Sequence, residues 1–367
     1  MQYVVCSHEP DNWYFSESTD LSEVLLVLAK SNNSSQTIFI NLSNQPKTSI
    51  ESLSVARIAQ SQVQADLTAG SGICEIQTNG KKFGEMLKVD LRKYNQLSWA
   101  LPTSFAQTDL CRVAYNPSTG RIFLPGHGII GNIKTIKLSE VVDLGPDGRD
   151  VYDAFSPTKS TTIYPAFWGY DSDVLSKVLQ RSNQYLNPLT APLPGRHLRD
   201  ANLLWDRAGT LMLPKELWLT TNRVAGVVLP SPTLSNVWWL ARWKSSDAKI
   251  RALMEQHLAL WFNSTLGLFS MLMQRQETRG AWVKFPKTWY EQLHIIDLDS
   301  LSPEQNKILD QLWGQIKSED LLPFPQICDD DSRKLIDDAF SQVRGLPQLD
   351  LLRRMLANEP IISMKTI

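Results

Sequence analysis

Positive charge and tryptophan are concentrated in one stretch of the sequence, residues 196–289. This stretch holds thirteen Lys or Arg and six Asp or Glu residues, a net charge of +7, and it also holds eight of the twelve tryptophans. Cations of this kind can bind phosphates, and polar or planar side chains beside them can contact nucleobases. The stretch is therefore the first candidate for a DNA-binding site. The alternative for each tryptophan is a place in the core, where this residue is usually found.

Arginine and asparagine side chains are the candidates for reading bases, because Arg can grip guanine and Asn can grip adenine through paired hydrogen bonds. The first choices are Arg223 and Arg242, which lie beside Asn222 and Asn236. Phosphate contacts are predicted for Arg275, Arg279 and Lys284, which follow a predicted helix. The other candidates for DNA contact are Arg196, Arg199, Arg207, Trp238 and Lys244. Each of these side chains could instead be a solvated surface group or a loop cap.

The last part of the chain has the opposite charge. Residues 290–367 hold fourteen acids and eight bases, a net charge of −6, so the whole chain sums to only −1. A segregated distribution of this kind remains compatible with a nucleic-acid binder. It also leaves open an interaction protein in which the acidic tail binds a basic partner and DNA has no part.

Several patterns that often mark catalytic sites are better explained by structure. Gly126-His127-Gly128-Ile129-Ile130-Gly131 fits a dinucleotide fingerprint, but the residues after it alternate like a strand where a helix should begin, so we predict a turn between strands. His127 and His197 have no spaced carboxylate or serine partner, and the sequence has no Gly-x-Ser-x-Gly. Asp147 is not followed by a nearby Glu-x-Lys, no two histidines are spaced for zinc, and the four cysteines lie far apart.

Hydrophobic periodicity predicts the elements that would position these residues. Strands are expected over 3–6, 23–28 and 37–42, with a short helix as an alternative for the second, and a helix over 48–64 behind Thr48. Short strands broken by Gly and Pro follow over 66–240. Helices are expected from 250 to 261 and from 264 to 273, with Asn263-Ser264-Thr265 capping them, and then near 303–318, 332–344 and 347–357.

Six strings of residues resemble large adenine-N6 DNA methyltransferases of bacterial restriction and phage-defence systems. The first, 15–27 (FSESTDLSEVLLV), looks like the segment that follows their catalytic motif. The strings 144–150 (LGPDGRD), 164–169 (YPAFWG) and 234–239 (LSNVWW) resemble the part beyond the catalytic domain. The string 260–267 (LWFNSTLG) is similar to the Asn-Ser helix of target-recognition domains, with 293–298 (LHIIDL) as the strand after it.

The methyl-transfer motif of that family does not occur in this sequence. The motif is Asp or Asn, then Pro-Pro, then an aromatic residue that stacks on a flipped base. Asn116-Pro117 and Asn187-Pro188 have a single proline and no aromatic residue after it. The resemblance therefore implies that 1–64 is a remnant of the catalytic sheet, and that the catalytic motif and the S-adenosylmethionine site precede Met1. We expect no catalytic residue, cofactor site or metal site in this chain.

Together these observations predict an α+β chain with three parts. Residues 1–64 would be a strand-rich remnant of a Rossmann-like methyltransferase sheet, 65–300 a β-rich target-recognition domain, and 301–367 a helical tail. The expected function is sequence-specific recognition of double-stranded DNA for a methyltransferase, in the cytoplasm and without a membrane segment. The alternatives are a subunit of a split methyltransferase, completed by a catalytic domain or subunit, and a protein-interaction module that does not bind DNA.

Overall fold

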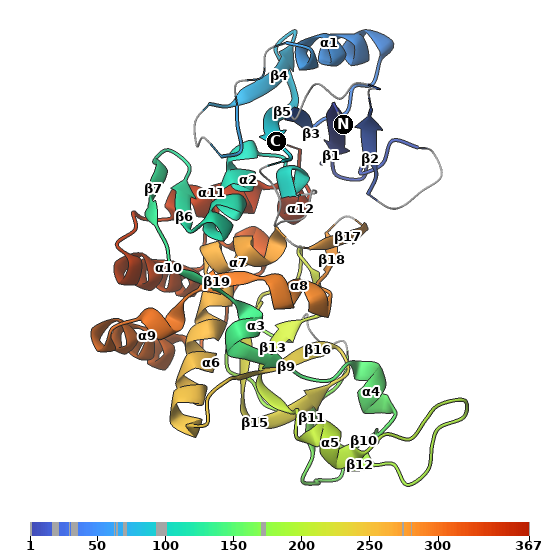
Figure 1. Ribbon diagram of the computed structural model, residues 1–367, viewed down its shortest axis with the longest axis vertical. Coiled ribbons are helices and arrows are strands. Elements are labelled where there is room, and N and C mark those ends of the chain that lie inside the picture. Colours follow the sequence, from blue (N-terminus) through green and yellow to red (C-terminus); the bar gives the residue numbers. More distant parts are fainter. Residues whose placement is uncertain are drawn as a thin grey trace. The chain divides into compact units, whose positions relative to one another are not determined.

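The chain folds into two compact units, each built from separate segments of the sequence. The computed structural model describes residues 2–16, 22–28, 30, 36–61, 63, 65–68, 72–92, 101–169, 174–273, 275–279 and 281–366. Unit 1 comprises 1–133, 269–283 and 349–367, and unit 2 comprises 134–268 and 284–348. Helices and several mostly antiparallel sheets occur in both units (Figure 1). The predicted α+β fold class is confirmed.

A five-stranded sheet forms the core of unit 1. Its strands are β1 (Tyr3–Ser7), β2 (Val24–Val27), β3 (Gln36–Leu42), β4 (Cys74–Thr78) and β5 (Lys81–Asp90), in the order β2-β1-β3-β5-β4. β1 and β3 are parallel, and the other neighbours are antiparallel. The three strands predicted near the N-terminus are therefore present. β2 differs from expectation in one respect, because an apolar run that suits burial on both faces lies exposed at the sheet edge.

Helix α1 (Ser49–Ala59) begins where the sequence predicts. Thr48 accepts a hydrogen bond from the Glu51 backbone at 3.2 Å, and the Glu51 carboxylate accepts one from the Thr48 backbone, which forms a capping box. The helix ends at Ala59, five residues before the predicted end at 64. Only Val55 and Ala59 are buried, so α1 covers the sheet with a narrow face.

The observed units do not follow the predicted domain boundaries at 64 and 300. β5 pairs with β3 over the full length of β3, so the first sheet continues to Asp90. At the other end, residues 349–367 pack in unit 1, whereas the predicted helical tail placed them with 301–348. Strand pairing and packing between distant segments cause both differences, and neither leaves a local signal in the sequence.

The remaining elements of unit 1 include a hairpin where the glycine-rich pattern lies. β6 (Arg121–Leu124) and β7 (Gly128–Asn132) are antiparallel, and Gly126 and Gly128 have φ of 79° and 71°, which favour glycine. The predicted turn between strands is confirmed. The other elements are η1 (Leu101–Thr103), α2 (Thr108–Tyr115), η2 (Asn116–Thr119), β17 (Gln276–Arg279), α11 (Asp350–Asn358) and α12 (Pro360–Ser363). Two further elements belong to unit 1 only in part. They are α7 (Thr265–Leu272), from Phe269 onward, and β18 (Trp282–Lys284), up to Val283.

A seven-stranded sheet forms the core of unit 2. Its order is β10-β12-β11-β15-β13-β16-β9, and all neighbours are antiparallel except β11 and β15. The strands are β9 (Val142–Leu144), β10 (Phe155–Thr158), β11 (Pro165–Phe167), β12 (Gln184–Pro188), β13 (Gly209–Pro214), β15 (Val227–Ser235) and β16 (Trp238–Trp243). The smaller strands are β8 (Thr135–Lys137), which pairs with β19 (His294–Ile296), and β14 (Glu216–Trp218).

Helix α6 (Ala248–Asn263) packs against β13, β15 and β16 of this sheet (Figure 1). At its end the Asn263 amide donates to the carbonyls of Gly226 (2.7 Å) and Ala259 (2.8 Å), and its oxygen accepts from the Ala225 N–H. The Ser264 hydroxyl accepts from the Gly267 N–H at 3.0 Å at the start of α7. The predicted capping role is confirmed for Ser264, whereas Asn263 connects the end of α6 to residues 225 and 226, and Thr265 donates to Asp337. The other helices are α3 (Leu138–Val141), α4 (Gly148–Tyr152), α5 (Ala201–Trp205), α8 (Lys287–Gln292), η4 (Leu298–Ser300), α9 (Pro303–Ile316), η5 (Phe324–Gln326) and α10 (Asp331–Arg344).

Among the described residues, no helix has both the length and the apolar character needed to cross a membrane.

A buried carboxyl in unit 1 gives the first testable prediction. Glu359 is 0% exposed and accepts hydrogen bonds from the Ala106 N–H and the Gln107 amide, and burial raises its pKa to about 7. The folded state therefore binds this proton more tightly than the unfolded state, whose carboxyl has a pKa near 4.5. As pH rises from about 4.5 to about 7, this group alone should lower the free energy of unfolding by up to about 3 kcal/mol.

Urea unfolding of the wild type and of Glu359→Gln across this pH range checks the expectation. The variant should lose that part of the pH dependence, and Glu319→Gln, at an exposed site, should keep it. Parallel stability curves for wild type and Glu359→Gln would contradict the assignment.

Candidate nucleic-acid interface

Three of the strings that carry the family resemblance meet at one place in unit 2. Asn236, in the turn between β15 and β16, lies at the centre. Its side-chain oxygen accepts from the Gly169 N–H at 3.1 Å, and its amide donates to the Tyr152 hydroxyl at 3.1 Å. Strands β11 and β15 pair beside it, with Ala166 opposite Leu234. The Asn236 side chain thus joins residues that are 84 and 67 positions away in the sequence.

Glycine makes this close approach possible. A Cβ at Gly148, the first residue of α4, would lie 2.5 Å from the Asn236 carbonyl oxygen. Nearby, the Gly145 N–H donates to the Leu240 carbonyl at 2.6 Å, so the string 144–150 is held against β16. The two glycines of that string therefore have a packing role, Gly148 against the turn at Asn236 and Gly145 against Leu240 of β16.

Lys215 closes the cluster from β13 and β14. Its Nζ donates to the Asn236 carbonyl at 3.2 Å and lies 4.3 Å from the centre of the Trp239 ring, in a cation–π contact. Asp147 is 3.9 Å away. Burial lowers the pKa of Lys215, and these partners keep the charge compensated.

Two aromatic residues of this cluster are at least partly exposed and were not among the predicted contact residues. Tyr152 is 36% exposed, and its ring packs edge-on against half-buried Trp168 with 4.8 Å between the ring centres. A tyrosine and a tryptophan at a polar surface can stack on sugar or base faces. The signal that marks Trp168 is its place in the string 164–169, whereas Tyr152 has no sequence signal of its own.

Three of the predicted DNA contacts have buried side chains and do not reach the surface. Asn222 (1% exposed) accepts from the Trp218 N–H, and Trp238 (2% exposed) lies in the core beside Phe167. Arg275 (7% exposed) donates to the Leu272 carbonyl at 2.8 Å and stacks on Phe105. These three residues are therefore left out of the interface. The physical reason differs for each residue. Asn222 holds a turn, Trp238 packs in the sheet core, and Arg275 binds a buried backbone carbonyl.

Asn236 is half-buried, but both ends of its amide are used by Gly169 and Tyr152. In this conformation it positions the surrounding segments and does not offer a free amide to adenine.

The remaining predicted cations lie at least partly at the surface. Arg207 is exposed and makes a 3.5 Å contact with the Leu144 carbonyl, and Arg223 and Arg242 are half-buried. Within the described part of the chain, no ion pair is recorded for these three. The side chain of Arg279 lies outside the described residues.

Four other predicted cations form ion pairs with acids, three of them with acids outside the basic stretch. Arg196 pairs with Asp153, and Arg199 pairs with Asp150 at 2.8 Å. Lys244 lies 3.5 Å from Asp143, and Lys284 lies 3.3 Å from Glu216. The acids of 143–153 thus offset part of the +7 charge of 196–289. These pairs are partly exposed, and exposed pairs contribute only about 0–1 kcal/mol each, so phosphates can compete for the cations.

Acids of the C-terminal region also have structural partners. Asp330 pairs with buried Arg333 at 2.7 Å, and the Asp337 carboxylate accepts from the Thr265 N–H and hydroxyl. Part of the −6 charge is therefore used inside unit 2. Among the described residues, no group of three or more His, Cys, Asp or Glu is arranged to hold a metal ion.

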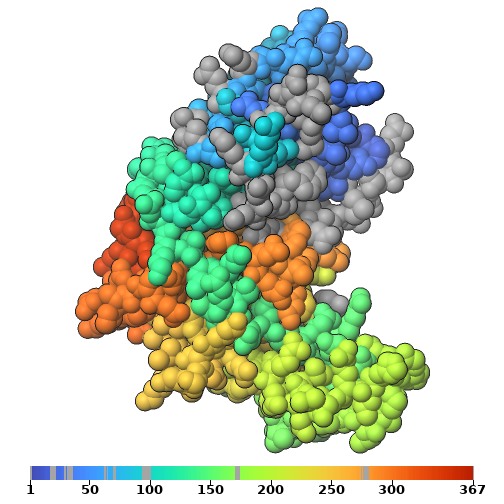
Figure 2. All heavy atoms as spheres, in the orientation of Figure 1, coloured from blue at the N-terminus to red at the C-terminus, as the bar shows by residue number. Residues whose placement is uncertain are grey.

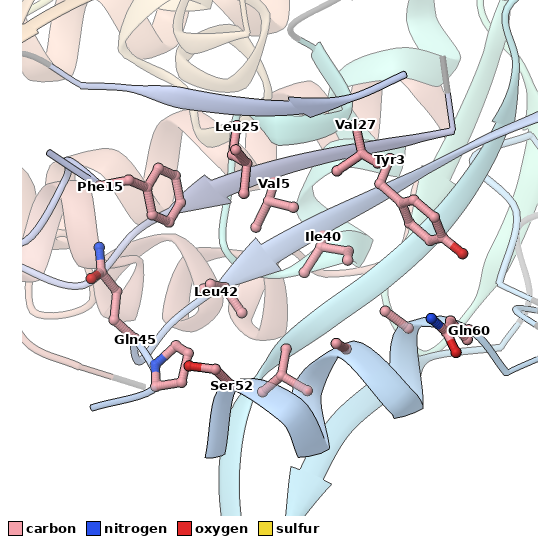
Figure 3. A pocket seen from close by; sticks show the side chains of 14 residues that line it. Tyr3, Val5, Phe15, Leu25, Val27, Ile40, Leu42, Gln45, Ser52 and Gln60 are labelled. Atoms are coloured by element: carbon pink, nitrogen blue, oxygen red, sulfur yellow. The ribbon is translucent and has the colours of Figure 1, made fainter. Parts of the chain in front are cut away.

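Unit 1 has a separate apolar groove on one face of its sheet. It has a volume of about 520 Å³ and lies between α1 and the side chains of β1, β2 and β3 that point to that face (Figure 3). Tyr3, Val5, Leu25, Val27 and Ile40 line the sheet side, and none of the described residues that line the groove is charged. On the edge strand, all four residues from Val24 to Val27 are exposed.

Comparison with solved structures gives distant likenesses, among them one to a restriction endonuclease. No family model and no curated protein matches the chain. The crystal structure of the type IIG restriction endonuclease BpuSI is similar to it, with a TM-score of 0.43 and 13% sequence identity. The similarity covers 99% of this chain and 43% of that one, so the chain spans less than half the length of that structure. A likeness at this TM-score is too distant to assign an activity or residue roles.

The cluster around Asn236 gives a stability prediction. Asn236→Ala should lower the free energy of unfolding by about 1–3 kcal/mol, because the Gly169 N–H and the Tyr152 hydroxyl lose their partner. Urea denaturation measures the change. Asn187→Ala, at an exposed position of β12, serves as the matched control and should cost less than about 0.5 kcal/mol. Equal stability of the two variants would show that Asn236 does not hold the three strings together.

Proposed function

We propose that the chain recognises double-stranded DNA for an adenine-N6 DNA methyltransferase of a restriction-modification or phage-defence system. In this proposal unit 2 docks on the duplex and reads a short site. The adenine is then presented to a catalytic domain that lies outside residues 1–367. Phosphate contacts fix the register of the protein on DNA, and base contacts give the sequence specificity.

The convergence of the strings 144–150, 164–169 and 234–239 carries the proposal. These strings resemble the part of the family beyond the catalytic domain, and in unit 2 they form one cluster with exposed Tyr152 and half-buried Trp168 at the surface. Surface cations of the same unit supply the groups that phosphates and guanines require. They are Arg196, Arg199, Arg207, Arg223, Arg242, Lys244 and Lys284.

Methyl transfer would need S-adenosylmethionine, and the described residues do not fit that cofactor. The glycine pattern 126–131 forms a hairpin, so it provides no helix N-terminus of the kind that binds a cofactor pyrophosphate. The sequence also has no Asp or Asn followed by Pro-Pro and an aromatic residue. In the proposal, cofactor binding and base flipping therefore belong to the catalytic domain.

Binding to duplexes of random sequence at several salt concentrations tests the proposal. The logarithm of the binding constant should fall linearly with the logarithm of salt concentration, because bound phosphates release their counterions. The variant Arg207→Gln with Arg242→Gln should bind about 3–30-fold more weakly and show a smaller salt slope. Lys307→Gln, an exposed cation on α9, is the control and should bind like the wild type. Absence of binding at low salt would contradict DNA recognition.

The groove of unit 1 favours a second candidate, a subunit of a split methyltransferase. Within the described part of the chain, β2 exposes apolar side chains on both faces and pairs with β1 alone, and folded proteins usually cover such an edge strand. The uncovered part of the sheet face, over β1 and β2, is about 10 Å wide, which matches one helix packed beside α1. Pairing of β2 with a second copy would lengthen the sheet but cover neither face. A catalytic subunit that adds a strand beside β2 and a helix beside α1 would lengthen the sheet and also cover the groove face.

The exposed apolar surface of this groove can be tested on the chain itself. Leu25→Glu should markedly reduce binding of an apolar fluorescent dye and reduce self-association, with little loss of stability, because Leu25 is 49% exposed. Leu335→Glu on α10, where the leucine is 46% exposed, is the matched control and should leave dye binding nearly unchanged. Equal dye binding by the two variants would show that the groove is not the main apolar surface. Co-purification with the product of the upstream reading frame, with methylation lost in Leu25→Glu, would support the split enzyme.

A further inference from the structure

An exposed arm projects from unit 2 between β12 and α5. Every residue from 190 to 200 is exposed, and the arm stands out in yellow-green at the lower right of Figure 1 and on the surface in Figure 2. Two backbone hydrogen bonds fix the base of the arm. The Leu189 N–H donates to the Ala154 carbonyl (2.8 Å), and the Arg199 N–H donates to the Asp153 carbonyl (3.0 Å). The arm therefore leaves from and returns to adjacent residues.

Local backbone restraints define the tip of the arm. The Arg196 N–H donates to the Leu193 carbonyl at 3.0 Å, with Pro194 and Gly195 between them and a φ of 71° at Gly195. Proline followed by glycine is the sequence that a type II turn prefers. Pro192 fixes one more φ angle on the outgoing side. The tip thus keeps a defined shape without a hydrophobic core beneath it.

Two cations on the returning side are held by two acids near the end of α4. The Arg196 guanidinium pairs with Asp153 and donates to the Arg149 carbonyl at 3.0 Å. Arg199 pairs with Asp150 at 2.8 Å and lies 3.8 Å from Asp153. The side chains of Arg196 and Arg199 are 37% and 52% exposed, so both guanidinium groups remain accessible from solvent.

These ion pairs can be exchanged for phosphates. Arg can bind a phosphate through two parallel hydrogen bonds, whereas in the free protein each of these two guanidinium groups has only one short contact with an aspartate. Exposed pairs contribute little stability, and the negative charge density of a duplex is much higher than that of two aspartates. The aspartates would nevertheless weaken binding, because each one loses its cation when the phosphate takes it.

We propose that residues 190–199 form a DNA-contacting arm, and that Asp150 and Asp153 hold Arg196 and Arg199 in place until duplex phosphates replace them. The inference rests on the proposed function and adds the element that makes the contact. The acid pair keeps the arm ordered in the free protein, and it lowers non-specific affinity because it competes with any phosphate.

The double variant Asp150→Asn with Asp153→Asn tests the role of the acids. Its affinity for a random duplex, measured by fluorescence anisotropy, should be about 5–30-fold higher than that of the wild type. The salt slope should become steeper by up to about 0.9 for each acid removed, because no aspartate then takes up a counterion. Asp329→Asn with Asp338→Asn, at exposed positions of the same unit, makes the same charge change and should have a much smaller effect.

Arg196→Gln with Arg199→Gln should bind more weakly than the wild type, with a smaller salt slope. If this variant binds like the wild type, or if the two aspartate double variants bind equally, the arm proposal is wrong while DNA recognition stands. If the wild type does not bind duplex at low salt, the proposed function and the arm's role both fail.

A measurement without DNA tests separately whether Asp150 and Asp153 hold the arm. In the free protein, trypsin should cleave after Arg196 and Arg199 several-fold faster in the Asp150→Asn, Asp153→Asn variant than in the wild type, and no faster in the control variant. Equal cleavage of all three proteins would show that the aspartates do not hold the arm.

Discussion

The side chain of Asn236 is the contact on which the candidate interface depends. It joins the turn between β15 and β16 to the Gly169 backbone and to Tyr152, and Gly148 lets α4 approach it closely. A half-buried amide with both ends satisfied stabilises a local arrangement because loss of either partner leaves a polar group unpaired. The same contact places Tyr152 and Trp168 beside each other and sets the position of α4, from which Asp150 and Asp153 reach the arm.

Local elements could be predicted from the sequence because their signals are local. The capping box at Thr48, the glycine hairpin near 126–131 and the cap at Ser264 each depend on a few adjacent residues. The composition of the two units could not be predicted, because β5 joins the first sheet from beyond residue 80 and residues 349–367 return to unit 1 from the far end of the chain. The apolar residues of β2 indicate a strand with both faces covered, but they do not show what covers them, so the exposure of β2 could not be predicted from its sequence.

Charge in a sequence segment differs from charge on a surface. The stretch 196–289 has a net charge of +7, yet Arg275 is buried and Arg196, Arg199 and Lys244 pair with acids that lie before residue 154. Asparagine and tryptophan can both contact bases, but the Asn222 side chain holds a turn and the Trp238 side chain is buried in the sheet core. Among the predicted residues, those on loops and strand ends remain available to a ligand, which is where binding residues are most often found.

Photo-crosslinking of the chain to duplex DNA, followed by mass spectrometry of the linked peptides, tests the central claim most directly. If unit 2 reads DNA through the surface around Asn236, the crosslinked peptides should come from 147–169, 190–207 and 234–244. Crosslinks confined to the helices of 303–344, or to unit 1, would contradict the account.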